Sequence, residues 1–241
     1  MIRVHQALAA AAPGDAITSQ AITTRAMLEA RGQRGEIVAE HVHPDLQRLV
    51  RRLDDGGAAI LRERDAVVIL RYSVWSRVVD VAAGAPGRLV FWYHNITPGD
   101  LLRPWNESLA RDCDRARAAL PEIARRASLL VADSSFNAAE LERIGLPGAV
   151  VVPLLLDVPS APVPSRPPQE PPVVLSVGRV APSKRVEDTI KAFTLYQRRR
   201  APAARLVLIG SDDGFEEYRV ALDRLAERIG TSGVVFTGRI S

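Results

Sequence analysis

The sequence "VVLSVGRVAPSKRVEDTIKAF", residues 173–193, combines the two patterns from which most of this chain is built. It opens with an uninterrupted apolar run, which is typical of a strand covered on both faces in a parallel sheet. Val186, Ile190 and Phe193 then recur at i, i+4 and i+7, so a helix begins close to Val186 and packs this face on the sheet. The stretch predicts a strand, a short turn and a helix.

The turn carries Arg179 and Lys184, in a chain whose only other lysine is Lys191. It follows the carboxyl end of a strand, where open α/β sheets bind ligands and where helix N-terminal amides favour anions. A guanidinium binds phosphate oxygens in a bidentate fork, and an ammonium adds a compact charge. Together the two cations predict a diphosphate site. Ser183 is a candidate cap of this helix. The alternative is two exposed cations near a helix start, where positive charge is unfavourable to the dipole.

The same alternation of apolar runs and helical patterns extends through the whole chain and predicts a doubly wound α/β fold. Strands are expected at 2–8, 35–40, 66–72, 88–94, 128–133, 149–155, 173–178, 205–210 and 234–238. Helices are expected near 16–31, 45–53, 74–83, 105–127, 135–144, 186–199 and 215–229.

A proline-rich segment divides the chain into two predicted domains. Residues 156–173 hold seven prolines, which favour a stiff extended connection. We expect an N-terminal Rossmann-like domain over 1–156, a linker over 157–172, and a second domain over 173–241. The second domain reads as βαβαβ, which is half of a usual Rossmann-like sheet, so we expect it to be incomplete.

Composition narrows the classes of protein. The chain is 47% hydrophobic and 25% charged, which is ordinary for a globular protein. Its single cysteine, Cys113, excludes an internal disulfide and a cysteine-built metal site. No apolar stretch approaches the roughly 20 residues of a membrane span, and no signal peptide is expected. We therefore expect a cytoplasmic protein, either free or peripherally associated with the inner face of the membrane.

The positive charge is carried almost entirely by arginine, at a net charge of +4. The simplest interpretation of the arginine runs is solvated helix faces, with nucleic acid or an anionic membrane surface as the alternatives. Aromatic residues make up 5% of the chain and do not interleave with the basic runs, so no nucleic-acid partner is expected.

Several segments resemble one enzyme family. "VLSVGRVAPSKRVEDTIKAF", "ARLVLIGSDDG" and "VVFTGRIS" are similar to the donor domain of retaining glycosyltransferases of family 4, which have the GT-B fold. "FWYHNITP", "LLVADSSFNAAEL" and "VVVPLLLD" are similar to the acceptor domain of the same enzymes. The resemblance covers essentially the whole chain. It implies two Rossmann-like parallel-sheet domains, with the second lacking the later part in which the family has two glutamates.

The resemblance implies a hexosyltransferase-type enzyme of polysaccharide or glycoconjugate assembly. It would transfer a sugar from a nucleotide-sugar donor to a glycan, lipid-linked or other glycoconjugate acceptor with retention, and without a metal or other cofactor. Arg179 and Lys184 would hold the diphosphate and stabilise its developing charge. The departing diphosphate oxygen would accept the proton of the incoming hydroxyl. The alternatives are a non-catalytic nucleotide- or phosphate-binding module and a sugar-nucleotide epimerase of related fold.

Other donor-side residues follow predicted strands. Gly14, in the loop after the first strand, would let the backbone approach the donor phosphates, or it forms a plain turn before a helix that Asp15 caps. The remaining donor-side candidates are Gly178, Gly210, Ser211, Gly238, Arg239 and Ile240.

The acceptor-side candidates also lie at strand ends. By the resemblance, His94 lies beside the transferring sugar and acts with Arg179 and Lys184 in catalysis; the alternative is a histidine bonded to the backbone. Trp75 either stacks on a sugar or packs internally. The other acceptor-side candidates are Ser73, Asn95, Ser134 and Ser135, of which the two serines in "DSS" are also candidate helix caps.

No metal site is expected. Asp112 and Asp114 form an acidic D-x-D pair, but they lie in a helical pattern that points them in different directions. His41 and His43 share a face of an extended segment but have no further histidine or cysteine nearby.

Overall fold

The computed structural model describes residues 2–155 and 171–240, and the chain forms two compact units. Unit 1 comprises Met1–Pro98 and Arg111–Val158, and unit 2 comprises Gly99–Ala110 and Pro159–Ser241. Most of the predicted linker over 157–172 lies outside the described residues. No helix in the described ranges is both long and apolar enough to cross a membrane.

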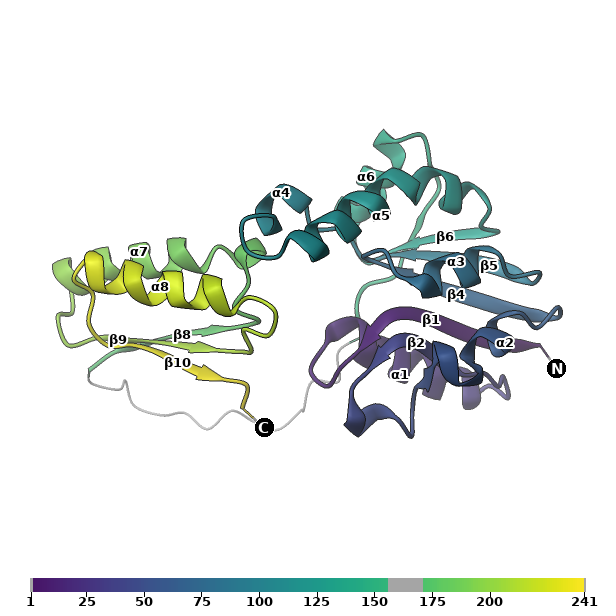
Figure 1. The fold of residues 1–241 in the computed structure, drawn as a ribbon, viewed down its shortest axis with the longest axis horizontal. Coiled ribbons are helices and arrows are strands. Elements are labelled where there is room, and N and C mark those ends of the chain that lie inside the picture. Colours follow the sequence, from purple (N-terminus) through teal and green to yellow (C-terminus); the bar gives the residue numbers. More distant parts are fainter. Residues whose placement is uncertain (1, 156–170, 241) are drawn as a thin grey trace. The chain divides into compact units, whose positions relative to one another are not determined.

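Unit 1 is built on a seven-stranded parallel sheet with the strand order β3-β2-β1-β4-β5-β6-β7 (Figure 1). Its strands are β1 (Arg3–Ala11), β2 (Ile37–Val42), β3 (Arg51–Arg52), β4 (Ala66–Tyr72), β5 (Arg88–Tyr93), β6 (Leu129–Ala132) and β7 (Val150–Val151). Its helices are α1 (Ala16–Glu29), α2 (Ala58–Leu61), α3 (Arg77–Ala83), α6 (Ser135–Arg143) and the part of α5 (Glu107–Arg125) that begins at Arg111.

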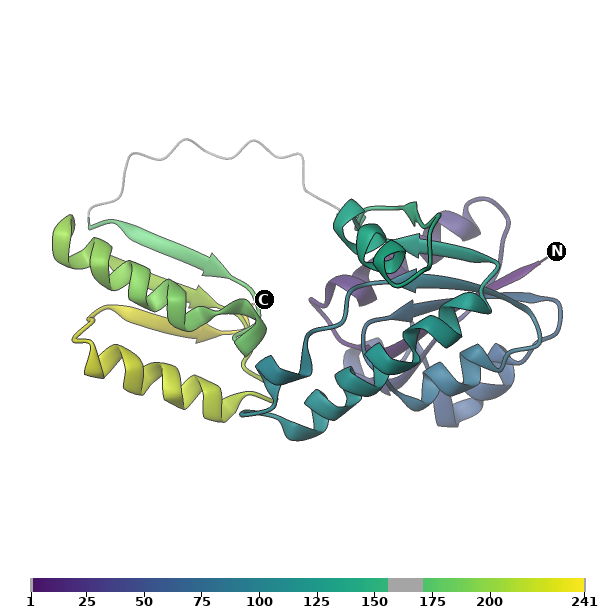
Figure 2. The same cartoon turned by 90° about the horizontal axis from the view of Figure 1, so that it is seen from above.

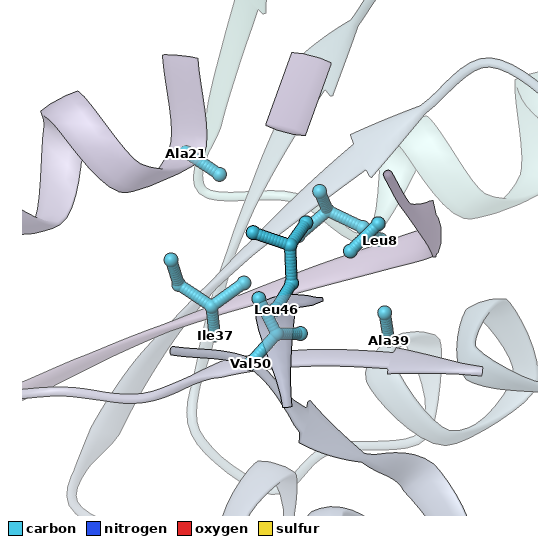
Figure 3. Packing of buried hydrophobic residues seen from close by; sticks show 7 residues of the cluster. Leu8, Ala21, Ile37, Ala39, Leu46 and Val50 are labelled. Carbon is cyan, nitrogen blue, oxygen red and sulfur yellow. The ribbon is translucent and has the colours of Figure 1, made fainter. Parts of the chain in front are cut away.

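Neighbouring residues of β4 show how the strands serve both faces of this sheet. Successive strand residues point to opposite faces. Arg71 accordingly bonds to side chains of α1, whereas the Tyr72 hydroxyl donates to Ala116 O of α5 on the other face. On the α1 face, buried side chains of β1, β2 and α1 form one apolar cluster, which includes Leu8, Ile37 and Ala21 (Figure 3). Burying one such Leu or Ile stabilises the fold by about 1.5–3 kcal/mol.

The predicted helix over 45–53 is wrong. This region contains a 3-10 turn (Pro44–Leu46), the short edge strand β3 and a helical turn (Leu53–Gly57). Leu46, Val50 and Leu53 imitate helical spacing, and all three are buried in the core. The His43 Nδ1 accepts from the Asp45 amide at 3.3 Å and caps only the short turn. Local turns thus bring the three side chains inward without a continuous helix.

Unit 2 contains a three-stranded parallel sheet with the order β10-β9-β8. Its strands are β8 (Val173–Val177), β9 (Arg205–Ile209) and β10 (Val234–Gly238). Helices α7 (Val186–Arg199) and α8 (Glu216–Arg228) lie side by side on one face of this sheet (Figure 2). On β8, Leu175 is 59% exposed and Val177 is 73% exposed, so the described residues leave part of the sheet uncovered.

A short helix that the sequence patterns did not predict also belongs to unit 2. Helix α4 (Gly99–Leu102) contacts the 3-10 turn Pro182–Lys184. The residues after α4 continue this packing: the Trp105 and Tyr218 rings lie 5.2 Å apart in an edge-to-face arrangement, and Asn106 Nδ2 donates to Gly214 O at 3.1 Å. Four residues are too few to show a helical period, which explains why α4 was missed.

Helix α7 begins at Val186, but the predicted cap is wrong. Ser183 lies within the 3-10 turn, and the N-cap residue is Arg185, whose side chain makes no capping bond. Arg185 has φ 52° and ψ 45°, in the left-handed region. Its guanidinium instead pairs with Asp188 and Glu187, both in the first turn of the helix.

The left-handed backbone of Arg185 gives the first prediction. Glycine adopts this conformation without the steric cost that other residues pay, so Arg185→Gly is expected to be more stable than Arg185→Ala. Both variants lose the same ion pairs, and their difference isolates the backbone. We expect a melting temperature about 2–4 °C higher for the glycine variant in a thermal scan. Equal melting temperatures would show that the left-handed backbone at position 185 carries no steric cost for a non-glycine residue.

Two glycines end neighbouring strands of unit 2 with nearly the same backbone. Gly178 has φ 153° and Gly210 has φ 150°. A Cβ on Gly210 would lie 2.0 Å from the Gly178 carbonyl oxygen, whereas a Cβ on Gly178 would meet nothing within 4 Å. The two strand ends therefore approach each other so closely that only one of the two positions has room for a side chain.

This asymmetry gives the second prediction. Gly210→Ala and Gly178→Ala each place an alanine at a similar positive φ, but only the first forces a backbone clash. Because overpacking costs about 1–3 kcal/mol, the free energy of unfolding should fall by that much more in Gly210→Ala. Chemical denaturation followed by circular dichroism measures the difference. If the alanine at 178 proved as costly, the close approach would be refuted.

Candidate functional site

The carboxyl ends of β4, β5 and β6 meet at one edge of the unit 1 sheet. Tyr72 pairs in register with Tyr93, and Tyr93 pairs with Ala132. The next residues, Ser73, His94 and Asp133, therefore follow neighbouring strands. The His94 amide also donates to Tyr72 O at 2.9 Å. This edge brings predicted residues together with others that the sequence analysis did not select.

A buried guanidinium occupies the centre of this edge. The Arg71 side chain is 2% exposed. Its Nε and Nη2 donate to Gln6 Oε1 at 2.9 and 2.7 Å, and Nη2 also donates to Thr24 Oγ1 at 2.9 Å. Its Nη1 donates to Gln20 Oε1 at 2.8 Å and lies 3.5 Å from His94 Nε2. Arg71 also lies over the Trp92 ring, with Cζ 4.5 Å from its centroid.

His94 and Trp92 share one carboxylate. His94 Nδ1 lies 2.7 Å from Asp133 Oδ2, and Trp92 Nε1 donates to Asp133 Oδ1 at 2.8 Å. The two rings stack with centroids 5.8 Å apart and an interplanar angle of 6°. Asp133 thus fixes the positions of both rings, and Arg71 contacts the face of Trp92.

Burial controls the charges of this cluster. It lowers the pKa of Arg71 to about 10, an effect that the nearby Asp133 charge opposes. Burial also lowers the pKa of His94, and the Arg71 charge acts in the same direction, while Asp133 and the more distant Asp15 act against it. At neutral pH the cluster therefore holds a charged Arg71 and a neutral His94.

His94 directly follows β5, and its imidazole is enclosed by protein groups. The side chain is 1% exposed, and both ring nitrogens face protein groups. It faces side chains rather than only the backbone. Direct contact between this ring and a sugar stays a prediction, and within unit 1 neither ring nitrogen points to solvent.

The other unit 1 candidates surround this cluster. Asn95 has φ 67°, and its Nδ2 donates to Asn137 Oδ1 at 2.9 Å. Ser134 caps α6, accepting from the Asn137 amide at 3.2 Å, which confirms its capping interpretation. Ser135 is the exposed first residue of α6. Their contacts with an acceptor stay predictions.

Trp75 is partly covered by a neighbouring side chain, whereas Gly14 has open space around it. The Arg115 guanidinium lies over the Trp75 ring, 4.0 Å from its centroid, so internal packing occupies one ring face. Gly14 is exposed with φ 77°, and nothing lies within 4 Å of a Cβ at this position. The following Asp15 caps α1 as predicted, accepting from the Thr18 amide at 2.7 Å. Ser73 is half-buried at the end of β4.

The unit 2 candidates also gather at one sheet edge. Gly178 N donates to Ile209 O at 2.8 Å, Val180 N donates to Ser211 O at 2.8 Å, and Gly210 N donates to Gly238 O at 3.0 Å. These backbone bonds tie the three strand ends together. Arg239 and Ile240 follow β10 directly, and both are exposed.

Arg179 and Lys184 are the two cations that the sequence analysis placed in this turn. Both are exposed, and neither side chain makes a hydrogen bond or ion pair with any residue that the structure describes. The Arg179 guanidinium lies 5.5 Å from the Phe215 ring centroid, which supports it from one side. By contrast, the adjacent Arg185 pairs with carboxylates, as does Lys191 with Asp188 at 3.5 Å. The two predicted cations thus remain available to an anion.

The start of α7 contributes less to an anion site than its position suggests. Glu187 and Asp188 occupy its first turn and already complement the positive end of the helix dipole. The Arg185 charge, with which both pair, in turn holds the pKa of Asp188 below its usual value. An anion at this edge would therefore rely on Arg179, Lys184 and the strand-end loops.

In the part of the chain that the structure describes, no three His, Cys, Asp or Glu side chains lie close enough together to hold a metal ion. Asp112 and Asp114 lie within α5, as their helical pattern predicts. His41 lies on β2, and His43 caps the 3-10 turn.

Sequence reasoning missed Arg71, Trp92 and Asp133 as members of the unit 1 cluster. One signal was present: Arg71 is a charged residue in the otherwise apolar run "AVVILRY", and buried charges require hydrogen-bonding partners. Its acceptors Gln6 and Gln20 lie on a predicted strand and a predicted helix, and no sequence pattern around them indicates that they bind Arg71.

The match to a known protein family lies in the C-terminal part of the chain. Residues 158–241 match the family glycosyl transferases group 1. A search of curated protein sequences finds no match.

Comparison with solved structures concerns the whole chain. Alr3699/HepE from Anabaena, solved with UDP and glucose, has a TM-score of 0.62 and 19% identity, covering 100% of this chain and 70% of that one. The lipopolysaccharide outer core galactosyltransferase WaaB has a TM-score of 0.55 and 16% identity, covering 100% and 69%. An alpha-glucosyltransferase solved with UDP and DNA containing an HMU base has a TM-score of 0.58 and 15% identity, covering 91% and 60%.

These similarities confirm the family resemblance and the fold expected from the sequence. Residues 158–241 match the glycosyl transferases group 1 family, and the chain has the fold of the GT-B glycosyltransferases, with two parallel α/β sheets of which the second is small.

Proposed function

We propose that this chain is the acceptor domain and the beginning of the donor domain of a hexosyltransferase that uses a nucleotide-sugar donor. The acceptor would be a glycan or a lipid-linked or other glycoconjugate, and the transfer would retain the anomeric configuration. Alr3699/HepE, whose fold this chain shares, has been solved with UDP-glucose, which makes UDP-glucose the first donor to test.

The observation that carries the proposal is the pair of unpartnered cations in unit 2. Arg179 and Lys184 flank a turn at the carboxyl edge of a parallel sheet, where α/β folds bind ligands. Neighbouring cations are neutralised by carboxylates, whereas these two have no ionic partner among the described residues. A diphosphate offers the charge and the oxygen geometry that a guanidinium and an ammonium bind together.

The same two cations suit the chemistry of transfer. As the acceptor oxygen bonds to the anomeric carbon, the bond from that carbon to the diphosphate oxygen breaks and negative charge grows on the leaving group. Fixed cations directed at this charge stabilise the transition state. The proton of the acceptor hydroxyl passes to the departing diphosphate oxygen, so the step balances without a protein base.

The strand-end loops supply the remaining donor contacts in this proposal. Gly178, Gly210 and Gly238 lack side chains, so the backbone at the sheet edge can approach a nucleotide. Ser211, Arg239 and Ile240 would border the base, and Gly14 is the donor-side candidate of unit 1. On the acceptor side, Ser73, Asn95, Ser134 and Ser135 would contact the incoming hydroxyl-bearing molecule.

The two lysines of the chain provide a matched test of donor binding. Lys184→Ala removes an unpartnered cation, whereas Lys191→Ala removes an equally charged group that already pairs with Asp188. Because a hydrogen bond to a charged group contributes about 1.5–3 kcal/mol, Lys184→Ala should weaken UDP-glucose binding by about 10- to 100-fold. Lys191→Ala should leave it within about twofold. Calorimetric titration and the ligand-dependent melting temperature measure both.

Inorganic diphosphate and GDP serve as controls for the ligand. UDP-glucose should stabilise the wild type more than diphosphate alone does. A wild type that neither UDP-glucose nor another nucleotide sugar stabilises would overturn the proposed function. So would an equal loss of affinity in both lysine variants, because binding would then reflect net charge rather than this site.

A further inference from the structure

The buried guanidinium of unit 1 has an acceptor for each of its N–H groups. An arginine carries five N–H donors and no acceptor. In Arg71, one Nε and one Nη2 donor share Gln6 Oε1, the second Nη2 donor bonds to Thr24, and one Nη1 donor bonds to Gln20. The remaining Nη1 donor faces His94 Nε2 at 3.5 Å. His94 therefore supplies the last acceptor of a buried cation.

This arrangement determines where His94 carries its proton. Asp133 is an ionised carboxylate that only accepts, so His94 Nδ1, at 2.7 Å from Oδ2, must donate. Arg71 only donates, so His94 Nε2 must accept. A proton on Nε2 would set two donors against each other and place a second positive charge beside Arg71. The neutral ring protonated on Nδ1 satisfies both neighbours.

The second buried histidine of unit 1 shows the opposite pattern and provides an internal reference. His5 is 2% exposed, and its Nδ1 accepts from the Glu36 amide at 3.1 Å. Its Nε2, 3.3 Å from Glu63 Oε2, must therefore carry the proton. Similar burial thus gives two different tautomers, because each is set by its hydrogen-bonding partners.

We propose that Arg71 and Asp133 are positioning residues that clamp His94 in the neutral tautomer protonated on Nδ1, so that it anchors the acceptor-side turn without taking up a proton during transfer. The turn continues through Asn95, which has a left-handed backbone and whose side-chain Nδ2 donates to Asn137 Oδ1. The role of this turn in acceptor binding rests on the proposed function. The protonation state of His94 follows from its two hydrogen-bonding partners alone.

The clamp limits which group can take the proton of the acceptor hydroxyl during sugar transfer. A histidine at the end of a strand near a reacting hydroxyl is the usual candidate for a general base. Here the nitrogen that would take the proton already accepts from Arg71. The proton must then leave with the departing diphosphate oxygen, and the rate of transfer should show no acidic limb that follows His94.

Nuclear magnetic resonance of the full chain tests the clamp without any substrate. Ring nitrogen correlations of nitrogen-15-labelled protein identify the protonated nitrogen of each of the four histidines. We expect the proton on Nδ1 of His94 and on Nε2 of His5. Because burial lowers the pKa of His94, its ring should stay neutral at neutral pH.

The charged groups that face His94 are Arg71, Asp133 and the more distant Asp15, and variants separate their effects. Arg71→Met removes the donor and the positive charge that face Nε2, so the pKa of His94 should rise while Asp133 keeps a proton on Nδ1. Asp133→Asn removes the carboxylate, so the pKa of His94 should fall further and the preference for Nδ1 should weaken. Glu63→Gln is the matched control: it should change the signals of His5 and leave those of His94 unchanged.

A wild-type His94 that carries its proton on Nε2, or that is doubly protonated at neutral pH, would overturn the clamp. So would an Arg71→Met protein that folds with the pKa of His94 unchanged, because that result would give Arg71 only a space-filling role. The wild-type spectrum remains decisive even if neither variant folds. Failure of UDP-glucose to stabilise a wild type with the expected tautomer would instead overturn the proposed function alone.

Discussion

Parallel strand pairing is the constraint from which both groups of candidate residues arise. All paired strands of the two sheets that the structure describes run in the same direction, so the loops after the strands of each sheet gather at one edge. Residues far apart in the sequence meet there. Arg71 and Gln6 are 65 residues apart, and His94 and Asp133 are 39 apart. Without this direction, the polar residues of neighbouring strand ends would lie at opposite edges.

The two edges treat positive charge in opposite ways. Unit 1 buries Arg71, and because a buried charge is costly unless its hydrogen bonds are satisfied, every donor of its guanidinium has an acceptor. Unit 2 leaves Arg179 and Lys184 exposed and without an ionic partner among the described residues. The first arrangement makes a rigid support, and the second leaves charge for a ligand. This difference explains why we infer positioning from one and anion binding from the other.

Much of the fold could be predicted because its signals are local. Strands β4 and β10 and helix α7 have the predicted bounds, since apolar runs and helical periods lie within single segments. Two regions differ. The helical spacing of Leu46, Val50 and Leu53 reflects burial by successive turns, and α4 is too short for any period to show. In both regions contacts with the rest of the chain outweigh local preference.

The amino-acid sequence was sufficient for the alternation of strands and helices, for the caps Asp15 and Ser134, and for the placement of Arg179 and Lys184 after a strand. Each of these follows from neighbours a few residues away. The enclosure of His94, its proton on Nδ1 and the five occupied donors of Arg71 required the folded chain. These features come from partners on separate strands and helices, and no local pattern records which of them will meet.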